Sequence, residues 1–483
     1  MILILAISLP ILFGALMPAL KMKKADRDVY LMTATVVTSC LVIFALFTHS
    51  GEVKLISFNE QLGLSLRLDH LGRLFAAVIA ILWPFTMLYA IAYMKHEEKQ
   101  TSFFAFFLIS YGTTLGIALS DNLLTLYVFY EAMTMATLPL VMHGGSQKAV
   151  SAGLKYLYYS LGGSAFAFIG LVYLVYFGGS TAFVPGGLFT GVDLTHTTQL
   201  RLGYVLCFLG FGVKAAVFPL HGWLPTASVA PTPVTALLHA VAVVKSGVFA
   251  IIRVTYFSFG ITVIKGSYAQ TVPLILCVFT IVFGCAMALK EKHLKRRLAY
   301  STVSNLSYIL FGALLLSQQG LYAGLMHLVF HALMKITLFL TAGVYNERAN
   351  VYYVDEMRGI AKVYPVFSVI FVIASLAMTG IPPLLGFLSK WFLAQAGFAA
   401  ANWLAYAGII ALLISAILTG IYLMVPSFAQ FFQAKREDQA QQIDWQFKVS
   451  LVGLCLILLA LTVYNTPVLE FLAKTAASAV TGG

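Results

Sequence analysis

Six ionisable side chains stand inside long apolar segments, where an electric charge is costly. The set consists of one carboxylate and five lysines: Glu131, Lys155, Lys214, Lys245, Lys335 and Lys390. A charge at the centre of a lipid bilayer costs about 3 kcal/mol or more, so such side chains are usually paired or serve ion transport. A lysine near a segment end, such as Lys155, could instead reach the membrane surface. The set as a whole predicts ion translocation, with the proton as the expected ion.

Three histidines accompany these lysines. His327, His331 and Lys335 are four residues apart, which places them on one face of a helix. Histidine titrates near neutral pH, so this face suits a hydrated proton relay. Zinc would need further ligands that the sequence does not supply, and no metal site is expected. His239 precedes Lys245 by six residues, which points the two to different faces. It is either a packing residue or a second arm of the path.

Prolines interrupt two of the apolar segments close to a lysine. Pro219 follows Lys214 by five residues, and proline cannot donate the backbone hydrogen bond that a helix needs. Pro382 and Pro383 lie about two helical turns before Lys390. Broken helices at membrane depth are tolerated where they line a cavity or water. Paired breaks of this kind resemble transporters built from inverted repeats, which predicts such repeats here.

The rest of the chain is typical of a membrane scaffold. It has 483 residues, of which 60% are hydrophobic and 10% charged, and apolar runs long enough to cross a bilayer recur from end to end. This predicts an all-α integral membrane protein with about 14 transmembrane helices. The expected spans are 2–21, 29–48, 73–94, 102–119, 121–142, 154–177, 203–220, 231–258, 271–289, 298–316, 322–345, 364–396, 403–431 and 447–468.

We expect a single polytopic membrane domain over residues 1–483. Its expected parts are helices 1–3 (1–100), a first inverted five-helix repeat of helices 4–8 (101–258), a second of helices 9–13 (271–431) and a last helix (447–468). Helices 7 and 12 are expected to be broken, and the stretches 49–72 and 178–203 to be loops. The glycine-rich stretch LGGSAFAFIGL in the sixth span is expected to allow close helix packing.

The basic residues lie in short loops rather than on one solvated face, so the net charge of +12 does not indicate nucleic acid binding. Most follow odd-numbered helices: Lys21, Lys23, Lys24, Arg27, Lys95, Lys99, Lys148, Lys290, Lys292, Lys295, Arg296, Arg297, Arg348, Arg358, Lys362, Lys435, Arg436 and Lys448. The positive-inside rule then places these loops in the cytoplasm and both termini on the outer side of a prokaryotic inner membrane.

Five ordered motifs within residues 100–425 resemble one family of membrane subunits. They are VFYEAMTMATLPLV, GFGVKAAVFPLHGWLPTASVAPTPVTALLHAVAVVKSG, LKRRLAYSTVSNLSY, HLVFHALMKITLFLTAG and GIPPLLGFLSKWFL. The family comprises the antiporter-like proton-translocating subunits of respiratory complex I, of multisubunit cation/proton (Mrp-type) antiporters and of membrane-bound energy-converting hydrogenases.

The resemblance implies a fold of 14 helices with two inverted five-helix units, and it implies roles for four residues. Glu131 matches the family's glutamate on helix 5, and Lys214 matches its lysine on helix 7. Lys245 matches the connecting lysine on helix 8, and Lys390 the terminal lysine on helix 12, where some members carry glutamate. The chain departs from many relatives at His293, where they carry an acidic residue, so a loop contact is expected to differ.

As a hypothesis, Glu131 pairs with Lys214, and protons pass along the remaining buried lysines and histidines through hydrated half-channels. Two charges about 10 Å apart at an effective dielectric constant of about 20 interact by about 1.7 kcal/mol. An interaction of this size lets a change of protonation at one group alter the proton affinity of the next group. It is too weak to hold either group in one protonation state. Sodium prefers several oxygen ligands, and one buried carboxylate supplies few, so we expect protons in this chain, with Na⁺ only at the level of a whole complex.

No cofactor and no catalytic centre are expected in this chain, so the energy must come from partners. The first interpretation is a proton-pumping subunit of a complex I-like or energy-converting hydrogenase-type redox complex. One alternative is a D-type subunit of a multisubunit Na⁺/H⁺ antiporter, and another is a membrane coupling subunit of an inorganic-carbon uptake complex. In each case we expect the lipid bilayer and other membrane subunits as partners, including paralogous antiporter-like subunits.

Overall fold

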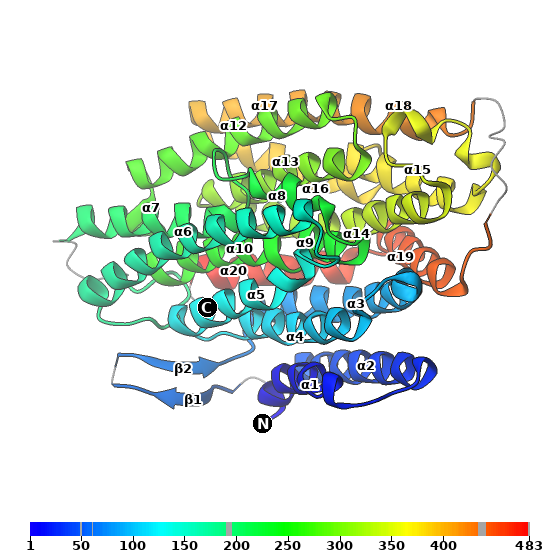
Figure 1. Ribbon diagram of the computed structural model, residues 1–483. Helices are drawn as coiled ribbons and strands as arrows, with labels where there is room; N and C mark the ends of the chain where they lie inside the picture. Colours follow the sequence, from blue (N-terminus) through cyan, green and yellow to red (C-terminus); the bar gives the residue numbers. More distant parts are fainter. Residues whose placement is uncertain (49–50, 60, 190–195, 433–440, 482–483) are drawn as a thin grey trace.

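The computed structural model describes residues 1–48, 51–59, 61–189, 196–432 and 441–481. Helices dominate these residues and pack side by side (Figure 1). By length and composition, eleven of the described helices could cross a membrane. The expected helical, polytopic membrane architecture is therefore confirmed. Lys435 and Arg436, two of the expected loop charges, lie outside the described residues.

The first part of the chain forms six long helices. They are α1 (Ile2–Leu16), α2 (Lys24–Thr48), α3 (His70–Tyr93), α4 (Gln100–Ala118), α5 (Leu123–Val141) and α6 (Gln147–Gly178), with short turns η1 (Met17–Ala19) and η2 (Met94–His96) after α1 and α3. Polar residues start several of these helices. Asn122 accepts a hydrogen bond from Thr125 N at 2.7 Å, and Ser146 accepts one from Ala149 N at 3.2 Å. Such N-caps satisfy backbone donors that a helix leaves free.

The second part has shorter and interrupted elements. They are α7 (Thr197–Lys214), α8 (Trp223–Thr226), η3 (Ala227–Val229), α9 (Thr232–Ala240), α10 (Val243–Arg253), η4 (Val254–Phe259), α11 (Gly260–Ile264), α12 (Tyr268–Lys290), α13 (Leu294–Leu314), α14 (Gln318–Ala349), η5 (Val354–Met357), η6 (Ile360–Lys362), α15 (Pro365–Thr379), α16 (Leu385–Ala400), α17 (Trp403–Thr419), η7 (Gly420–Met424), α18 (Val425–Ala429), α19 (Trp445–Val463) and α20 (Thr466–Thr481). Every residue of α10 is buried, as is most of α14, so these two helices form the centre of the bundle.

Both expected helix breaks are present. α7 ends at Lys214 before Pro219, and α15 ends at Thr379 before the proline pair, with α16 starting at Leu385. The expected span 231–258 matches a candidate membrane span over Thr232–Ile264, but it is not one continuous α-helix, because it divides between α9 and α10 and then continues as the π-helix η4. Neither proline nor glycine marks the division. Ala242 N instead donates to Leu237 O at 2.8 Å, which closes a wider turn.

Two further elements differ from the expectation. The segment 49–72 contains an antiparallel hairpin of β1 (Val53–Ser57) and β2 (Gly63–Leu66), not only a loop. The expected last helix, 447–468, ends at Val463, and the separate helix α20 follows it. We call the end of the bundle that carries the hairpin the hairpin end; α3 and α5 begin there. The end at which α3, α5 and α14 finish is the opposite end.

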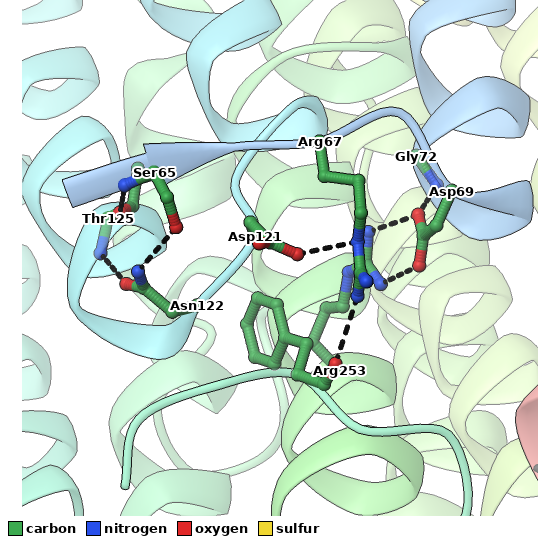
Figure 2. Close-up of polar contacts among 9 residues, drawn as sticks. Ser65, Arg67, Asp69, Gly72, Asp121, Asn122, Thr125 and Arg253 are labelled. Atoms are coloured by element: carbon green, nitrogen blue, oxygen red, sulfur yellow. Dashed lines mark hydrogen bonds and ion pairs between the residues drawn. The ribbon is translucent and has the colours of Figure 1, made fainter. Parts of the chain in front are cut away.

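Alternating charges tie the hairpin end together (Figure 2). Arg253, the last residue of α10, is 1% exposed, and its guanidinium donates to both carboxylate oxygens of Asp69. Asp69 also caps α3 by accepting from Gly72 N at 2.8 Å. Next to this pair, Arg67 after β2 forms an ion pair with Asp121 before α5, with Nε and Oδ1 2.6 Å apart. The ends of α3, α5 and α10 are thereby fixed relative to the hairpin.

The two carboxylates of this set have opposite pKa shifts. Burial alone would raise the pKa of Asp69, but the Arg253 guanidinium outweighs it and holds the pKa below its ordinary value. Burial raises the pKa of Asp121 from 3.8 to about 6, with Arg67 opposing the shift and Glu52 adding to it. Asp121 therefore takes up a proton on folding over this pH range, whereas Asp69 does not.

The pH dependence of stability should reveal this difference. Because the folded-state pKa of Asp121 is raised, its contribution to stability is lost as pH rises from 3.8 to about 6. Asp121→Asn should therefore become more stable relative to the unaltered protein across that range, as measured by thermal unfolding in detergent. Asp69→Asn is the control. The pKa of Asp69 is lowered in the folded protein, so the loss of stability that this substitution causes should be the same throughout the range. If the difference in stability between Asp121→Asn and the unaltered protein does not change with pH, the raised pKa of Asp121 is contradicted.

Glycines let α6 and α7 approach each other closely, as the glycine-rich stretch predicts. A Cβ atom at Gly163 would lie 2.7 Å from Gly210 O, and one at Gly170 would lie 2.6 Å from Gly203 O. Both distances are too short for a real side chain, so the two backbones touch at these positions. Gly162, the neighbour of Gly163, is exposed, and a Cβ atom there would meet no other atom within 4 Å.

These neighbouring glycines provide a matched test of the packing. Gly163→Leu should lower the free energy of unfolding by about 1–3 kcal/mol, the usual cost of overpacking, because α7 must move away. Gly162→Leu should leave it nearly unchanged. Thermal unfolding of the purified protein in detergent compares the two, and equal effects would show that the α6–α7 contact does not depend on Gly163.

Candidate functional site

Lys214 is fully buried at the last position of α7. Its ammonium group donates to Tyr130 O at 2.5 Å and lies 3.3 Å from the centre of the Tyr130 ring. The carbonyl dipole and the ring face both stabilise a cation. α10 packs directly on this turn, because a Cβ atom at Gly247 would lie 2.5 Å from Ala215 N. The break after Lys214 therefore brings α10 close to the lysine.

Glu131 follows Tyr130 on α5 and is partly exposed. The expected direct ion pair with Lys214 is not formed: among the described residues the two charges are not within 4.0 Å, and Lys214 donates to the peptide carbonyl instead. Consecutive residues point about 100° apart around a helix, so the Glu131 side chain leaves α5 in a different direction from the Tyr130 ring, which packs on Phe211 of α7. The Oε1 atom of Glu131 has no hydrogen-bond partner in the described part of the chain.

Lys245 lies in the first turn of α10, just after the division from α9. Its Nζ atom is 2.5 Å from Nδ1 of His331 on α14, and both side chains are fully buried. A hydrogen bond between these atoms needs one donor and one acceptor. The pair therefore holds a single proton between the two nitrogens, as ammonium with neutral imidazole or as amine with an imidazole N–H. Nε2 of His331 has no partner within the described residues.

His327 lies one turn before His331, with ring centroids 5.8 Å apart. Its Nε2 is 3.1 Å from Asn305 Oδ1 on α13, and its Nδ1 is 2.9 Å from Ser389 Oγ on α16. Asn305 Nδ2 donates to Ser301 O at 2.8 Å, which leaves Oδ1 as the acceptor for the histidine. The serine hydroxyl can donate or accept. His327 can therefore gain or lose a proton at Nδ1 and keep both contacts.

Lys335 lies one turn after His331 and points to α13. It donates to Leu298 O at 3.0 Å and to Ser301 Oγ at 2.8 Å. Tyr422 donates to the same hydroxyl at 2.7 Å. Ser301 therefore connects Lys335, through its own peptide carbonyl and Asn305, to His327.

Lys390 on α16 uses the second helix break. It donates to Met378 O at 2.9 Å and to Thr379 O at 2.8 Å, the last carbonyls of α15. These carbonyls have no partner within their own helix and carry the negative end of its dipole. Gly380 has φ +91°, and a Cβ atom there would lie 3.1 Å from Lys390 Cδ. The break thus creates both the acceptors and the space for the lysine.

Two of the expected site residues lie apart from this row. His239 stacks on Phe339 of α14, with centroids 4.6 Å apart, and neither ring nitrogen has a partner among the described residues. Lys155 donates to Thr226 Oγ1 of α8 at 3.1 Å, near the surface of α6. The structure therefore does not bring Lys155 to the other lysines, and its role in proton translocation stays a prediction.

The groups that connect the lysines were not expected from the sequence. Ser301 and Asn305 are four residues apart in LKRRLAYSTVSNLSY, a spacing that could have indicated a polar helix face. Ser389 gives no such signal. Lys295 was expected as a loop charge, and this is wrong: it is 7% exposed and donates to Ala230 O at 3.0 Å. The reason is that α13 begins at Leu294, so Lys295 lies in its first turn and faces inward.

Removing the His327 ring should destabilise the protein. His327→Ala leaves Asn305 Oδ1 and the Ser389 hydroxyl without this partner, and each buried unsatisfied group costs about 1–3 kcal/mol. His327→Gln can still donate and accept, so it should restore part of the loss. Thermal unfolding in detergent measures both, with the exposed His96→Ala as the control. If His327→Ala unfolds at the same temperature as His96→Ala, these contacts do not support the fold.

Buried ionisable groups that join broken helices across a bundle define a class of ion-translocating membrane proteins. The chain belongs to the NADH:quinone oxidoreductase/Mrp antiporter family, whose transmembrane model matches residues 120–419. A second model, for the N-terminus of chain 5 of NADH-ubiquinone oxidoreductase (complex I), matches residues 56–104. The chain is therefore an antiporter-like membrane subunit, as its motifs predict.

Individual relatives agree with this assignment. NADH-quinone oxidoreductase subunit N of Desulforudis audaxviator is 34% identical over 372 residues, which are 74% of this chain and 71% of that protein. One of the Na(+)/H(+) antiporter subunits of Alkalihalophilus pseudofirmus is 32% identical over 387 residues, 72% of this chain but only 46% of that longer protein.

Solved structures show the same fold. A chain of the membrane-bound sulfane sulfur reductase, an archaeal respiratory membrane complex, superposes with a TM-score of 0.90 at 23% identity, over 99% of this chain and 98% of that one. A chain of the Mrp complex from Dietzia sp. DQ12-45-1b superposes with a TM-score of 0.85 at 21% identity, over 99% and 97%.

Proposed function

We propose that this chain is a proton-translocating subunit of a multisubunit membrane complex, and that the Lys245–His331 contact is the centre of its path. The observation that carries the proposal is the 2.5 Å distance between Lys245 Nζ and His331 Nδ1. This pair holds one proton in either of two positions and keeps its hydrogen bond in both. A second proton would place two cations in contact, so the repulsion between them favours onward transfer.

The onward steps follow the hydrogen bonds of α14. From His331 a proton can pass to His327 one turn away, whose Nδ1 is bonded to the Ser389 hydroxyl beside Lys390. Asn305 and Ser301 hold His327 and Lys335 in one hydrogen-bonded network, although an amide and a peptide carbonyl do not themselves carry protons. The Ser389 hydroxyl both donates and accepts, so it supports proton transfer at His327.

Lys214 and Glu131 form the other end of the row. Glu131 is near Lys214 without touching it, so a shift of the carboxylate towards or away from the lysine changes how strongly Lys214 holds its proton. Because Glu131 is partly exposed, a neighbouring subunit can supply that shift. This supports membrane partners, including paralogous antiporter-like subunits.

The ion is the proton rather than Na⁺. A sodium site needs several converging oxygen ligands. The described row offers nitrogen atoms, single hydroxyls and peptide carbonyls already bonded to lysines, and Glu131 is its one carboxylate. Any Na⁺ path would lie elsewhere in the complex.

The helices support the finer topology that we propose. Eleven long apolar helices together with α7, α13 and the pair α15–α16 would give 11 + 3 = 14 spans. We propose that α4–α10 and α12–α18 are the two inverted repeats, since each contains a break beside a lysine, after Lys214 in the first and before Lys390 in the second. The opposite end, which carries most of the loop lysines and arginines, then faces the cytoplasm of a prokaryotic cell, with both termini outside.

A redox complex of the complex I or energy-converting hydrogenase type is the first choice of assembly. The relative that this chain covers by 71% is named as an NADH-quinone oxidoreductase subunit, whereas the named Na(+)/H(+) antiporter subunit is covered by less than half. A multisubunit Na⁺/H⁺ antiporter is the alternative. The proteins that co-purify with the chain decide between them.

Proton flux through the reconstituted complex tests the proposed function. The complex, purified through a tag on this chain, is placed in vesicles, and a potassium diffusion potential set by valinomycin drives proton uptake, reported by a pH dye inside. Lys245→Met, Lys335→Met and Lys390→Met should each lower the flux by at least about tenfold, because each removes a proton carrier. Lys265→Met, an exposed lysine between α11 and α12, is the matched control.

Two results would overturn the proposal. One is flux in the three variants equal to that of Lys265→Met, with the complex intact by size-exclusion chromatography. The other is a flux that requires Na⁺ and disappears when choline replaces it.

A further inference from the structure

Lys155 on α6 has no counter-charge within the described part of the chain. Its ammonium group donates to the neutral hydroxyl of Thr226 at 3.1 Å, and among the described residues no carboxylate lies within 4.0 Å of it. The Tyr159 hydroxyl lies close by, because a Cβ atom at Gly222 would be 3.0 Å from that oxygen and 3.8 Å from Lys155 Nζ. An ammonium group and a hydroxyl are therefore available together to an anion from outside the chain.

The length of α6 places Lys155 near the lipid headgroups. α6 has 32 residues and is about 48 Å long, whereas the hydrocarbon core of a bilayer is about 30 Å thick. An equal overhang leaves about 9 Å of the helix outside the hydrocarbon at each end. Lys155 lies eight residues, or about 12 Å, from the first residue of α6, which is at the opposite end of the bundle. It is therefore close to the boundary between headgroups and hydrocarbon.

Two adjacent grooves surround this part of α6. One, of about 510 Å³, lies along α6 beside Lys155 and Tyr159. The other, of about 550 Å³, lies between α6, α8 and the start of α13. Gln147 and Ser151 line both grooves, so the two are continuous at the start of α6.

The charged side chains that line these grooves are all positive. They are Lys155 in the first groove, and Lys148 and Arg296 in the second. Arg296 is already paired with Glu291, with Nη2 and Oε2 3.3 Å apart, whereas Lys148 has no carboxylate within 4.0 Å in the part of the chain that the structure describes. Lys148, Ser151 and Lys155 follow one another at intervals of three and four residues, which places them on one face of α6. Two unpaired cations therefore face the same ligand.

An apolar stripe continues from these cations towards the middle of the membrane. Val150, Leu154 and Tyr158 recur every four residues in the wall of the first groove, and all three are exposed. Positive charge at the membrane surface with an apolar wall below it matches an anionic phospholipid, because basic pockets between transmembrane helices bind such headgroups. A carboxylate of a partner subunit would use the cations but not the apolar stripe.

We propose that the two grooves bind one anionic phospholipid in the leaflet at the opposite end. Its phosphate group lies between Lys148 and Lys155, with the Ser151 hydroxyl as a further donor, and an acyl chain follows the stripe of Leu154 and Tyr158. The lipid supplies the counter-charge of Lys155 and holds the start of α6 against α8 and α13. This role is separate from proton translocation and does not depend on it.

Thermal unfolding of the complex with defined lipids tests the site. The complex, purified through a tag on this chain, is placed in detergent micelles with a rising fraction of phosphatidylglycerol, which should raise its unfolding temperature more than phosphatidylcholine does. Lys148→Met and Lys155→Met should each need about fivefold more phosphatidylglycerol for half of this effect, because one lysine near an anionic lipid contributes about that factor. Lys155→Arg keeps a phosphate-binding cation and should respond like the unaltered complex.

Lys292→Met is the matched control, since Lys292 is an exposed lysine that lines neither groove. If Lys148→Met and Lys155→Met respond to phosphatidylglycerol as Lys292→Met does, the proposal is wrong. Equal stabilisation by phosphatidylcholine, or by inorganic phosphate alone, would also overturn it, because the first would show no preference for an anion and the second no need for a lipid.

Labelling covers the case in which the lysine variants do not assemble. Ser151→Cys places a thiol where the two grooves meet, and Cys40→Ser removes the exposed cysteine of the described chain. The thiol should react with a maleimide in phosphatidylcholine nanodiscs and be protected in nanodiscs that contain phosphatidylglycerol. Equal labelling in both lipids would show that the grooves do not bind the anionic lipid. Equal protection in both would show that a protein partner covers them, and either result would overturn the proposal.

Discussion

Peptide carbonyls, rather than carboxylates, solvate most of the buried lysines of this protein. Lys214, Lys335 and Lys390 each donate to backbone oxygens, as does Lys295. A carboxylate partner would hold a lysine permanently charged, because losing the proton would leave an unpaired anion in a medium of low dielectric constant. A carbonyl stabilises the ammonium group yet stays neutral when the proton leaves. This choice of partner suits the role of proton carrier that we propose for these lysines.

Some of these carbonyls come from interrupted helices, whereas Lys214 and Lys335 bind carbonyls inside α5 and α13. Inside an intact helix each carbonyl already accepts a backbone N–H, although it keeps a second lone pair. A helix that ends early offers carbonyls with no other partner, and the last turn of α15 does so for Lys390. The gap between η3 and α9 presents Ala230 O to Lys295, and this carbonyl also accepts from the Thr235 hydroxyl at 3.0 Å. Helix breaks would weaken a soluble protein. In this protein they provide carbonyl hydrogen-bond acceptors for lysines at membrane depth.

Ion pairs occupy different places. The pairs among the described residues lie at the two ends of the bundle, as with Arg253 and Asp69 at the hairpin end and Arg348 and Asp444 at the opposite end. There they hold helix ends together near water, where paired charges are tolerated. Ion pairs thus lie at the two ends, whereas the carbonyl-bound lysines lie in the middle, with the exception of Lys295 at the opposite end. Lys245 differs from the other lysines, since its partner is the titratable His331.

The sequence by itself determined the membrane character of the chain, the two proline-marked breaks and the lysines beside them. These follow from local rules: apolar length sets a span, and proline removes a backbone donor. It also indicated that His327, His331 and Lys335 share a face, because helical periodicity depends on spacing alone.

Only the tertiary structure decided which of these groups meet. Distances between helices depend on packing, and the glycines of α6, α7 and α10 show how small residues set them. The contact of Lys245 with His331 lies between residues 86 positions apart, and no local rule predicts it. Lys295 was misplaced in a loop because the start of α13 depends on its neighbours, and Glu131 does not contact Lys214 because the lysine donates to the Tyr130 carbonyl instead. The proposed proton path therefore depends on helix packing, whereas its component residues can be recognised in the sequence.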